Sequence, residues 1–174
     1  MNCPLCASQN SQYLPRAREG RVYLKCAICD FVWLDPAHRV SATEEVARYL
    51  EHNNSTEIPA YSAYLARLAR PVLQHVRQGA NGLDYGCGPV EGMKAVVEPL
   101  GFSVHSYDPY FFPKLPPGPF DFVLCSEVAE HFYAPAEEFT KIDSLLKSGG
   151  VLGVSSWFMP PLEKFEEWGY RRDK

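Results

Sequence analysis

Four short apolar segments in residues 81–157 constrain the fold of this chain more than any other feature. They are NGLDYG, FSVHSYD, FDFVLCS and VLGVSSW, and two segments with a helical pattern, EGMKAVVEPL and PAEEFTKIDSLLKSGG, lie between them. Strands that alternate with helices form parallel sheets, because each crossover returns the chain over one face of the sheet. The pattern therefore predicts an α/β fold with a doubly wound parallel sheet and helices on both faces.

Polar residues follow these apolar segments where the predicted strands end. Ligands of open parallel sheets bind at the carboxyl ends of the strands. The residues expected there are the glycine turn Gly86-x-Gly88, Asp108, Glu127 and the pair Ser155-Ser156. Because the carboxyl ends of parallel strands lie at one edge of the sheet, we expect these residues to contribute to a single site.

Two C-x-x-C pairs near the N-terminus predict a separate small module. Cys3 and Cys6 are separated from Cys26 and Cys29 by nineteen residues, and RVYLKC and DFVWL alternate as hairpin strands do. This spacing is typical of a four-cysteine zinc site in a zinc ribbon. Four sulfurs complete a tetrahedral shell and leave no position for water, so the site is expected to be structural. A redox C-x-x-C pair is the alternative.

The chain is expected to divide into three parts. Residues 1–40 form the predicted zinc ribbon, residues 41–79 a helical linker or cover, and residues 80–174 the sheet domain. The linker has Thr43 as a candidate helix cap, and Pro71 is expected to kink or divide its second helix. An amphipathic stripe in that helix consists of Tyr61, Tyr64, Leu65, Leu68, Val72, Leu73 and Val76.

Composition and charge favour an ordinary cytoplasmic protein. Of 174 residues 46% are hydrophobic, the formal net charge is −4, and no apolar run is long enough to span a bilayer. The N-terminus lacks the regions of a signal peptide. Residues 1–40 carry a charge of +2 (five Lys and Arg against three Asp and Glu), which the roughly −2 of a zinc–tetrathiolate cluster offsets. An RNA partner therefore has little electrostatic support, although Arg16, Arg18 and Arg21 could form a local patch.

The glycine turn and Asp108 predict an adenosine-containing cofactor. Glycines let a ligand approach the backbone, and an acid at the end of the next strand can bind a ribose. A dinucleotide requires G-x-G-x-x-G with its pyrophosphate at a helix N-terminus. Here Glu91 stands at the start of the helix and Asp84 just before the turn. Both carboxylates would repel a pyrophosphate and attract a cation, which favours S-adenosylmethionine over NAD.

With these segments in place, the chain resembles a known family. LDYGCGP, SYDPYF, FDFVLCSEVAEHF and LLKSGGVLGVSS resemble the successive motifs of class I S-adenosylmethionine-dependent methyltransferases, which have a Rossmann-like fold. The likeness covers residues 80–157, and YLKCAICDFVWLDP is similar to zinc ribbons that precede methyltransferase domains in several bacterial families. The cofactor-binding set that this resemblance implies is Asp84, Gly86, Cys87, Gly88, Asp108, Pro109, Cys125, Ser126 and Glu127.

The resemblance implies a place for each group and also shows three departures. Asp84, Gly86 and Gly88 would hold the methionine part, Asp108 the ribose, and residues 125–127 would line the cofactor. Val90 stands where the family usually has a third glycine. Only twelve residues, five of them proline, separate Asp108 from Asp121. The segment that usually contacts adenine is therefore missing or reduced.

Aromatic residues of the shortened connection offer a substitute for that segment. Tyr110, Phe111 or Phe112 could stack on the adenine, and packing under the proline-rich loop is the alternative. The third departure concerns the sheet, which has seven strands in the family. Only seventeen residues follow Trp157, too few for the last hairpin, so the sheet is expected to lack its last strands and to have an exposed edge.

Glu127, Glu130 and His131 are the candidate catalytic residues. Their spacing of i, i+3 and i+4 predicts that they share one face of a helical turn. His131 titrates near neutral pH and could act as the base. The same three side chains are plausible ligands of a divalent cation. Ordinary solvent-exposed charges at a helix start, with His131 bonded locally, are the alternative. Cys87 and Cys125 are treated as small core-facing residues and not as nucleophiles.

These observations predict a methyltransferase that acts on a small molecule or a sugar-derived metabolite. Tyr61, Tyr64 and Trp157 could line the acceptor pocket, although core packing is the simpler assignment. The alternative is a degenerate methyltransferase fold that binds RNA or protein through its zinc ribbon. A nicotinamide enzyme is the third option. The sequence does not indicate an oligomeric state.

Overall fold

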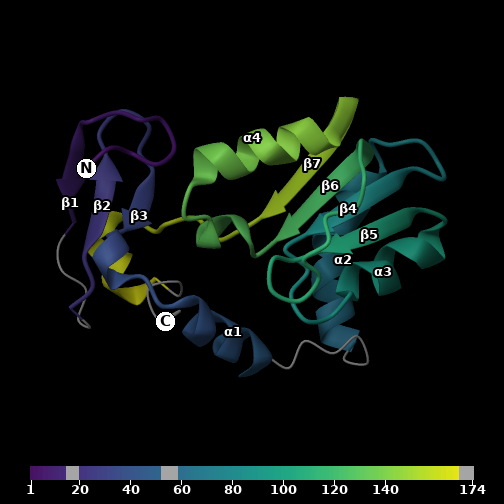
Figure 1. Cartoon of the computed structure of the whole chain (residues 1–174), viewed down its shortest axis with the longest axis horizontal. Coiled ribbons are helices and arrows are strands. Elements are labelled where there is room, and N and C mark those ends of the chain that lie inside the picture. The colour runs from purple at the N-terminus through teal and green to yellow at the C-terminus, as the bar shows by residue number, and fades with distance from the viewer. Residues whose placement is uncertain (15–19, 52–58, 169–174) are drawn as a thin grey trace. The chain divides into compact units, whose positions relative to one another are not determined.

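The computed structural model describes residues 1–14, 20–51 and 59–168 (Figure 1). Contacts group the chain into two compact units. The first unit comprises residues 1–45, 133–136 and the chain from Trp157 onward, and the second comprises residues 46–132 and 137–156. The domain boundaries near residues 40 and 79 remain predictions.

A three-stranded antiparallel sheet forms the core of the first unit. Its strands are β1 (Ser11–Tyr13), β2 (Tyr23–Cys26) and β3 (Val32–Leu34), in the order β1-β2-β3. Tyr23 pairs with Leu34 and Lys25 with Val32, so the hairpin expected from RVYLKC and DFVWL is present. A 3-10 turn, η1 (Pro36–His38), follows this sheet.

Residues near the C-terminus complete the packing of this unit. The 3-10 helix η4 (Leu162–Glu167) carries Phe165, which is 2% exposed and packs with Leu14 and Tyr23. The rings of Phe165 and Tyr23 meet edge to face with their centroids 5.3 Å apart. Burial of these aromatic side chains stabilises the unit through the apolar area that they remove from water.

A four-stranded parallel sheet forms the centre of the second unit. Its strands are β4 (Asn81–Tyr85), β5 (Ser103–Tyr107), β6 (Phe120–Ser126) and β7 (Leu146–Ser155). The order is β5-β4-β6-β7, and each neighbouring pair is parallel. The expectation of four parallel strands in a Rossmann-like α/β fold is confirmed.

Helices cover both faces of this sheet (Figure 1). One face packs against α2 (Pro59–Leu73) and α3 (Gly92–Val97), which a 3-10 turn, η2 (Glu98–Leu100), extends. The other face packs against α4 (Pro135–Leu145). α1 (Ala42–Glu51) precedes α2 in the chain. Period-two alternation in the strands supplies both cores: Phe122 and Leu124 face α2, whereas Val123 and Cys125 face α4.

Three local expectations about helix ends are wrong. The cap of α1 is Ser41 instead of Thr43, because the Ser41 hydroxyl accepts from the backbone N–H of Glu44 while the Glu44 carboxylate accepts from the Ser41 N–H. Pro71 does not divide α2, since it lies in the last turn of that helix. The helix expected to run to Gly149-Gly150 ends at Leu145, and β7 begins at Leu146.

The proline-rich connection from β5 to β6 contains no helix or strand element, as its length predicts. Leu115 of this connection packs against the core on the α4 face, and β5 and β7 are the outer strands of the sheet. Among the described residues, no helix combines the length and the hydropathy that a membrane crossing requires. Arg16 and Arg18 of the proposed basic patch lie outside the described residues.

Candidate functional site

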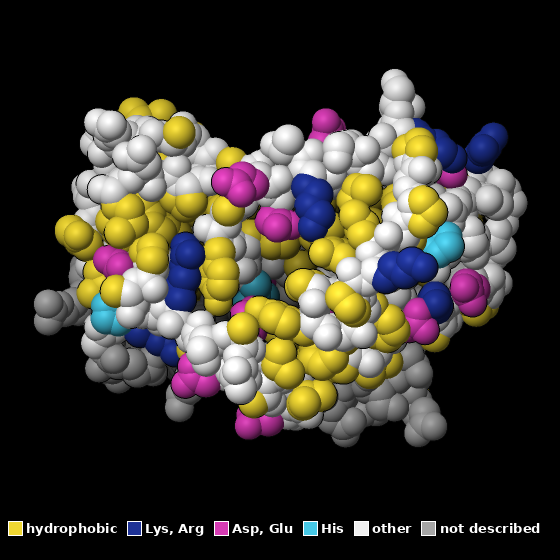
Figure 2. Space-filling view, in the orientation of Figure 1, with side chains coloured by type: hydrophobic (Ala, Val, Ile, Leu, Met, Phe, Trp, Pro, Cys, Tyr) yellow, Lys and Arg dark blue, Asp and Glu magenta, His cyan; other side chains and the backbone are white. Residues whose placement is uncertain are grey.

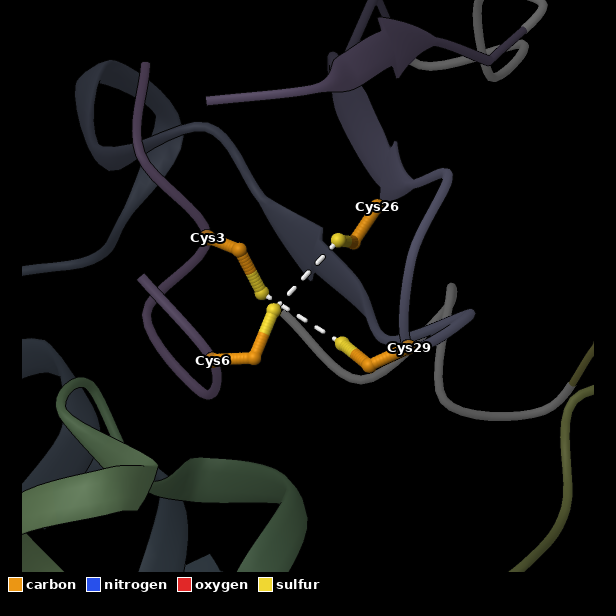
Figure 3. A group of neighbouring side chains, drawn as sticks. All are labelled: Cys3, Cys6, Cys26 and Cys29. Carbon is orange, nitrogen blue, oxygen red and sulfur yellow. Dashed lines mark hydrogen bonds between the residues drawn. The ribbon is translucent and has the colours of Figure 1, made fainter. Parts of the chain in front are cut away.

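The four cysteines of the two C-x-x-C pairs converge on one point (Figure 3). Their sulfur atoms all lie within 4.8 Å of one another, with Cys3 and Cys29 3.6 Å apart and Cys6 and Cys26 also 3.6 Å apart. A tetrahedral zinc ion with Zn–S bonds of ~2.3 Å requires sulfurs separated by about 3.8 Å. The geometry therefore fits a metal ion of this kind.

Two matching backbone turns bring these sulfurs together. Ala7 follows the first pair and donates its N–H to the carbonyl of Cys3, while Asp30 follows the second pair and donates to Cys26. Both residues adopt a left-handed backbone, with φ near 60°. Hydrogen bonds from the backbone N–H groups of Cys29 and Ile28 lower the pKa of Cys26 to about 6, which favours the thiolate that a metal binds.

The glycine turn after β4 directs its N–H groups into the protein. Gly86 and Cys87 both donate to the carbonyl oxygen of Tyr107, at 2.8 and 3.1 Å, and Gly88 donates to Oδ2 of Asp108 at 3.0 Å. An anion-binding turn points such N–H groups at its ligand. Because Tyr107 of β5 accepts two of them and Asp108, just after β5, accepts the third, this turn offers no cradle for a phosphate.

The two glycines of the turn serve different purposes. Both have a positive φ, +81° at Gly86 and +67° at Gly88. A Cβ atom at Gly86 would lie 2.5 Å from Cγ1 of Val128, so packing requires a glycine there. A Cβ atom at Gly88 would have no protein atom within 4 Å. Gly88 is therefore the position at which a ligand can approach the backbone.

Gly92 at the start of α3 performs the packing role of a third glycine. A Cβ atom there would lie 2.7 Å from a methyl group of Leu65 and 3.0 Å from the ring of Tyr61, both on α2. Val90 precedes the helix, and its carbonyl oxygen accepts from the N–H of Gly92 at 2.7 Å. The close approach of α3 to α2 thus depends on Gly92, while Val90 lies in the turn.

Asp84 is a buried carboxyl group next to other acids. Its side chain is 4% exposed, and no hydrogen bond to it occurs among the described residues. Burial, together with the charges of Asp108 and Glu91, raises the pKa of Asp84 to about 8. Glu91 itself pairs with Lys94, which lowers its pKa. Carboxyl groups that lie this near one another attract positive charge.

Replacing Asp84 by asparagine is expected to flatten the pH dependence of folding stability. An unfolded aspartate loses its proton near pH ~4, whereas the folded one holds it to about pH 8. The free energy of unfolding should therefore fall by about 1.4 kcal/mol per pH unit between these values. Urea unfolding of the zinc-loaded protein between pH 6 and 8 would measure the slope, which should be smaller by this amount in Asp84→Asn.

Asp121 provides the matched control for this prediction. Lys147 holds the pKa of Asp121 below its usual value, so this carboxyl group stays ionised in both states above pH ~6. Asp121→Asn should leave the slope between pH 6 and 8 unchanged. An equal slope in wild type and Asp84→Asn would contradict a protonated, buried Asp84.

Two tyrosines of α2 extend to the carboxyl ends of the strands. Both are half-buried beside the α2-side core. Tyr61 lies near Asp84 and Cys87, and burial with these neighbours raises its pKa. The hydroxyl of Tyr64 lies beside the Glu127 carboxylate and Ser155, and burial together with the nearby Glu127 carboxylate raises its pKa. The stripe position alone suggested core packing, so the sequence missed both hydroxyl contacts.

The segment after β6 differs from the expected helical turn. Glu127 lies outside the short 3-10 turn η3 (Ala129–His131) and has a left-handed backbone with φ of 55°. Glu127, Glu130 and His131 therefore do not share one helical face, because the left-handed residue turns the chain before the helix begins. A non-glycine residue in this conformation is strained and occurs often at functional sites.

Glu130 and His131 face different neighbours. Ser156 donates its hydroxyl to Oε2 of Glu130 at 3.3 Å, beside the ends of β6 and β7. The imidazole of His131 meets the ring of Tyr49 on α1 edge to face, with centroids 5.8 Å apart, and Tyr49 also contacts Phe111. Within the described parts of the chain, the cysteines are the only group of acids, histidines and cysteines whose ligand atoms converge on a metal position.

The side chains of the remaining predicted cofactor-binding residues differ in burial and in hydrogen-bond partners. The side chain of Cys125 is fully buried under α4, and burial raises its pKa to about 12. A cofactor contact from Cys125 would therefore come from its backbone. The hydroxyl oxygens of Ser126 and Ser155 lie 3.4 Å apart. The thiol of Cys87 donates to the carbonyl oxygen of Gly88, and Pro109 is exposed. The cofactor-binding and catalytic roles of these residues remain predictions.

The methyltransferase domain family model matches residues 33–174, which includes all of the four-stranded sheet and its helices. No curated protein matches the sequence.

Proposed function

Since the chain belongs to the methyltransferase domain family, we propose that it transfers a methyl group from S-adenosylmethionine to a small polar acceptor, such as a sugar-derived metabolite. The observation that supports this proposal most is the buried Asp84 carboxyl group, which has no hydrogen bond among the described residues and lies near Asp108 and Glu91. Gly88, four residues further along the same turn, has open space beside its backbone. When bound, S-adenosylmethionine supplies a methyl group activated by a positively charged sulfur.

The residues around the turn fit this cofactor better than a dinucleotide. The sulfonium and ammonium groups are cations, and the carboxyl groups of Asp84, Asp108 and Glu91 lie near one another at this turn. A pyrophosphate would meet the same carboxyl groups, and the N–H groups of residues 86–88 already donate to Tyr107 and Asp108. These electrostatics argue against the nicotinamide alternative.

The ends of β6 and β7 supply the proposed acceptor site. Tyr64 lies beside Glu127 and Ser155, and Ser156 donates a hydrogen bond to Glu130. Hydroxyl groups and carboxylates at such a site recognise an acceptor through its own hydroxyl or amine groups. Methyl transfer mainly requires the acceptor to be aligned and, for a hydroxyl acceptor, a base to take its proton. We assign these tasks to Glu127, Glu130 and His131.

Replacement of Tyr64 by phenylalanine is expected to reduce methyl transfer without loss of cofactor binding. The variant removes one hydroxyl that holds Glu127 and Ser155, so the acceptor side loses its alignment while the turn at residues 84–88 is intact. We expect a fall of about tenfold or more in rate at saturating cofactor. Tyr133→Phe, at an exposed tyrosine of the first unit, is the matched control. Equal losses of rate and cofactor affinity in Tyr64→Phe would contradict a role for Tyr64 on the acceptor side alone.

The alternative function is a methyltransferase-like module that binds RNA or protein through the ribbon. One observation favours a protein partner, because Tyr13 and Ile28 of the ribbon are 69% and 67% exposed. On the face seen in Figure 2, the Lys and Arg side chains of the described residues lie as separate groups among acidic and hydrophobic ones. Nucleic-acid binding usually relies on a continuous basic surface.

A labelled-methyl assay would test the proposed function against this alternative. Zinc-loaded full-length protein would be incubated with tritiated S-adenosylmethionine and cell extract, divided into small-molecule, RNA and protein fractions. We expect label in the small-molecule fraction and its loss in Glu127→Gln, while Glu137→Gln, at an exposed glutamate of α4, retains it. Cofactor binding without label in any fraction would support the binding module instead.

A further inference from the structure

The Asp108 carboxylate at the end of β5 already has several hydrogen-bond partners in the protein. Its Oδ1 atom accepts from the backbone N–H groups of Tyr110 at 2.9 Å and Phe111 at 3.1 Å. Its Oδ2 atom accepts from the N–H of Gly88 at 3.0 Å. The side chain is 6% exposed. Asp108 thus joins the loop after β5 to the glycine turn after β4.

A count of acceptor positions shows what this carboxylate can still bind. An ionised carboxylate has roughly four lone-pair positions, two on each oxygen. The two N–H groups of the following loop fill both positions on Oδ1, and Gly88 fills one position on Oδ2. A single position on Oδ2 is left for a ligand.

The backbone around Asp108 holds this arrangement in place. Asp108 and Phe112 exchange two backbone hydrogen bonds, at 3.0 and 3.1 Å, which close the intervening residues into a tight loop. Pro109 has no N–H, so the first donors available to Oδ1 are those of the next two residues. Rotation of the carboxylate toward a ligand would break its hydrogen bonds to these N–H groups, and hydrogen bonds to a charged group are stronger than those between neutral groups.

We propose that Asp108 binds a single hydroxyl of the cofactor's ribose, through Oδ2, and that the chain therefore tolerates removal of the other hydroxyl. This inference rests on the proposed function, because it assumes an adenosyl cofactor at the turn. A ribose has two neighbouring hydroxyl groups, and a carboxylate with both oxygens free can accept from both. In this chain the loop after β5 uses the positions that the second hydroxyl would need.

Two deoxy analogues of the demethylated cofactor provide the test. Isothermal titration of the zinc-loaded, full-length protein would compare S-adenosylhomocysteine with its 2′-deoxy and 3′-deoxy forms. One analogue should bind ~10-fold or more weakly, since it lacks a hydrogen bond to a charged group, and the other should bind within about threefold. Losses of about tenfold or more for both analogues would overturn the inference while supporting the cofactor. No binding of S-adenosylhomocysteine itself would overturn both the inference and the proposed function.

Hydrogen exchange would test the same arrangement independently of affinity. The N–H groups of Gly88, Tyr110 and Phe111 should be protected in the free protein and equally protected when S-adenosylhomocysteine is saturating. Loss of protection at these positions on binding would mean that the carboxylate leaves the loop for the ribose, and would overturn the inference.

Asp108→Asn separates the backbone role from ribose binding. An amide retains one acceptor oxygen, so the variant should lower the melting temperature of the cofactor-free protein by ~5 °C. Asp143→Asn, at an exposed aspartate of α4, should leave this temperature unchanged. An Asp108→Asn variant with unchanged melting temperature would show that the carboxylate does not hold its loop, and would overturn the inference.

Discussion

Replacement of Cys26 by serine is expected to remove the metal from this protein and to unfold the small sheet formed by β1, β2 and β3. The Cys26 side chain is fully buried among the other three cysteines, and its sulfur lies 3.6 Å from that of Cys6. The apparent free energy of zinc binding to structural sites is about 10–16 kcal/mol. The buried residues of this small sheet besides its cysteine are few, namely Tyr23, Leu24 and Trp33. Loss of one ligand should therefore outweigh what the remaining core supplies.

Metal analysis and hydrogen exchange would measure this effect. The wild-type protein should carry about one zinc ion per chain and Cys26→Ser close to none. Amides of residues 23–34 should lose their protection. Cys87→Ser changes a cysteine outside the cluster and should retain the zinc. A Cys26→Ser variant with full zinc content, or one with an intact β2–β3 hairpin after loss of zinc, would contradict a structural metal site.

Alanine substitutions at Gly86 and Gly88 are expected to have opposite consequences. Gly86→Ala should destabilise the fold by several kcal/mol, because its Cβ atom would overlap Val128 at 2.5 Å in addition to the strain of a positive φ. Gly88→Ala has only the backbone strain of about 1–2 kcal/mol. Its Cβ atom would occupy the open space beside the turn, so it should weaken cofactor binding by ~10-fold or more.

Urea unfolding and titration with S-adenosylhomocysteine would distinguish the two variants. Val128→Ala provides the matched test for Gly86, because removal of the valine methyl groups makes room for the added Cβ atom. The double variant Gly86→Ala, Val128→Ala should recover the part of the lost stability that comes from overlap with Val128. The part that comes from the positive φ at residue 86 should remain lost. If Gly88→Ala bound the cofactor normally, the open space at this glycine would not be the ligand site.

The sequence predicted the features that depend on periodicity and on fixed spacing. The apolar segments around Leu83 and Val123 predicted two strands of a parallel sheet, and the structure has β4 and β6 at its centre. The cysteine spacing is set by the covalent geometry of a tetrahedral site. Glu91 at the helix start indicated a cationic ligand, and the prolines between Asp108 and Asp121 indicated a connection that lacks the usual segment. Both inferences were possible because charge and proline act locally.

Features that depend on packing between distant segments could not be predicted in this way. Tyr64 occupies a core-facing position of α2, and only the placement of α2 across β7 brings its hydroxyl to Glu127 and Ser155. Asp108 appeared to be a free ribose acceptor, because nothing in its sequence shows that Gly88 donates to it. The left-handed backbone of Glu127 was missed for the same reason, since the neighbouring spacing favoured a regular helical turn.

Local competition between signals explains the smaller errors. Ser41 and Thr43 can both cap a helix, and the choice follows from Glu44, which lies three residues after Ser41 and completes a capping box. The segment LLKSGG has helix formers followed by glycines, yet its first leucine and the residues after it pair with β6. Sheet pairing therefore outweighed helix propensity there.

The central claim is that the turn at residues 84–91 is a site for a cationic adenosyl cofactor, and proton release on binding tests it most directly. Calorimetric titration of the zinc-loaded protein with S-adenosylmethionine at pH 7, in buffers with different ionisation enthalpies, would count the protons. Asp84, whose pKa is raised to about 8, is largely protonated at this pH in the free protein and should ionise beside a bound cation. We expect about one proton released per cofactor bound, and none in Asp84→Asn. Absence of binding, or binding with no proton released by the wild-type protein, would contradict the account.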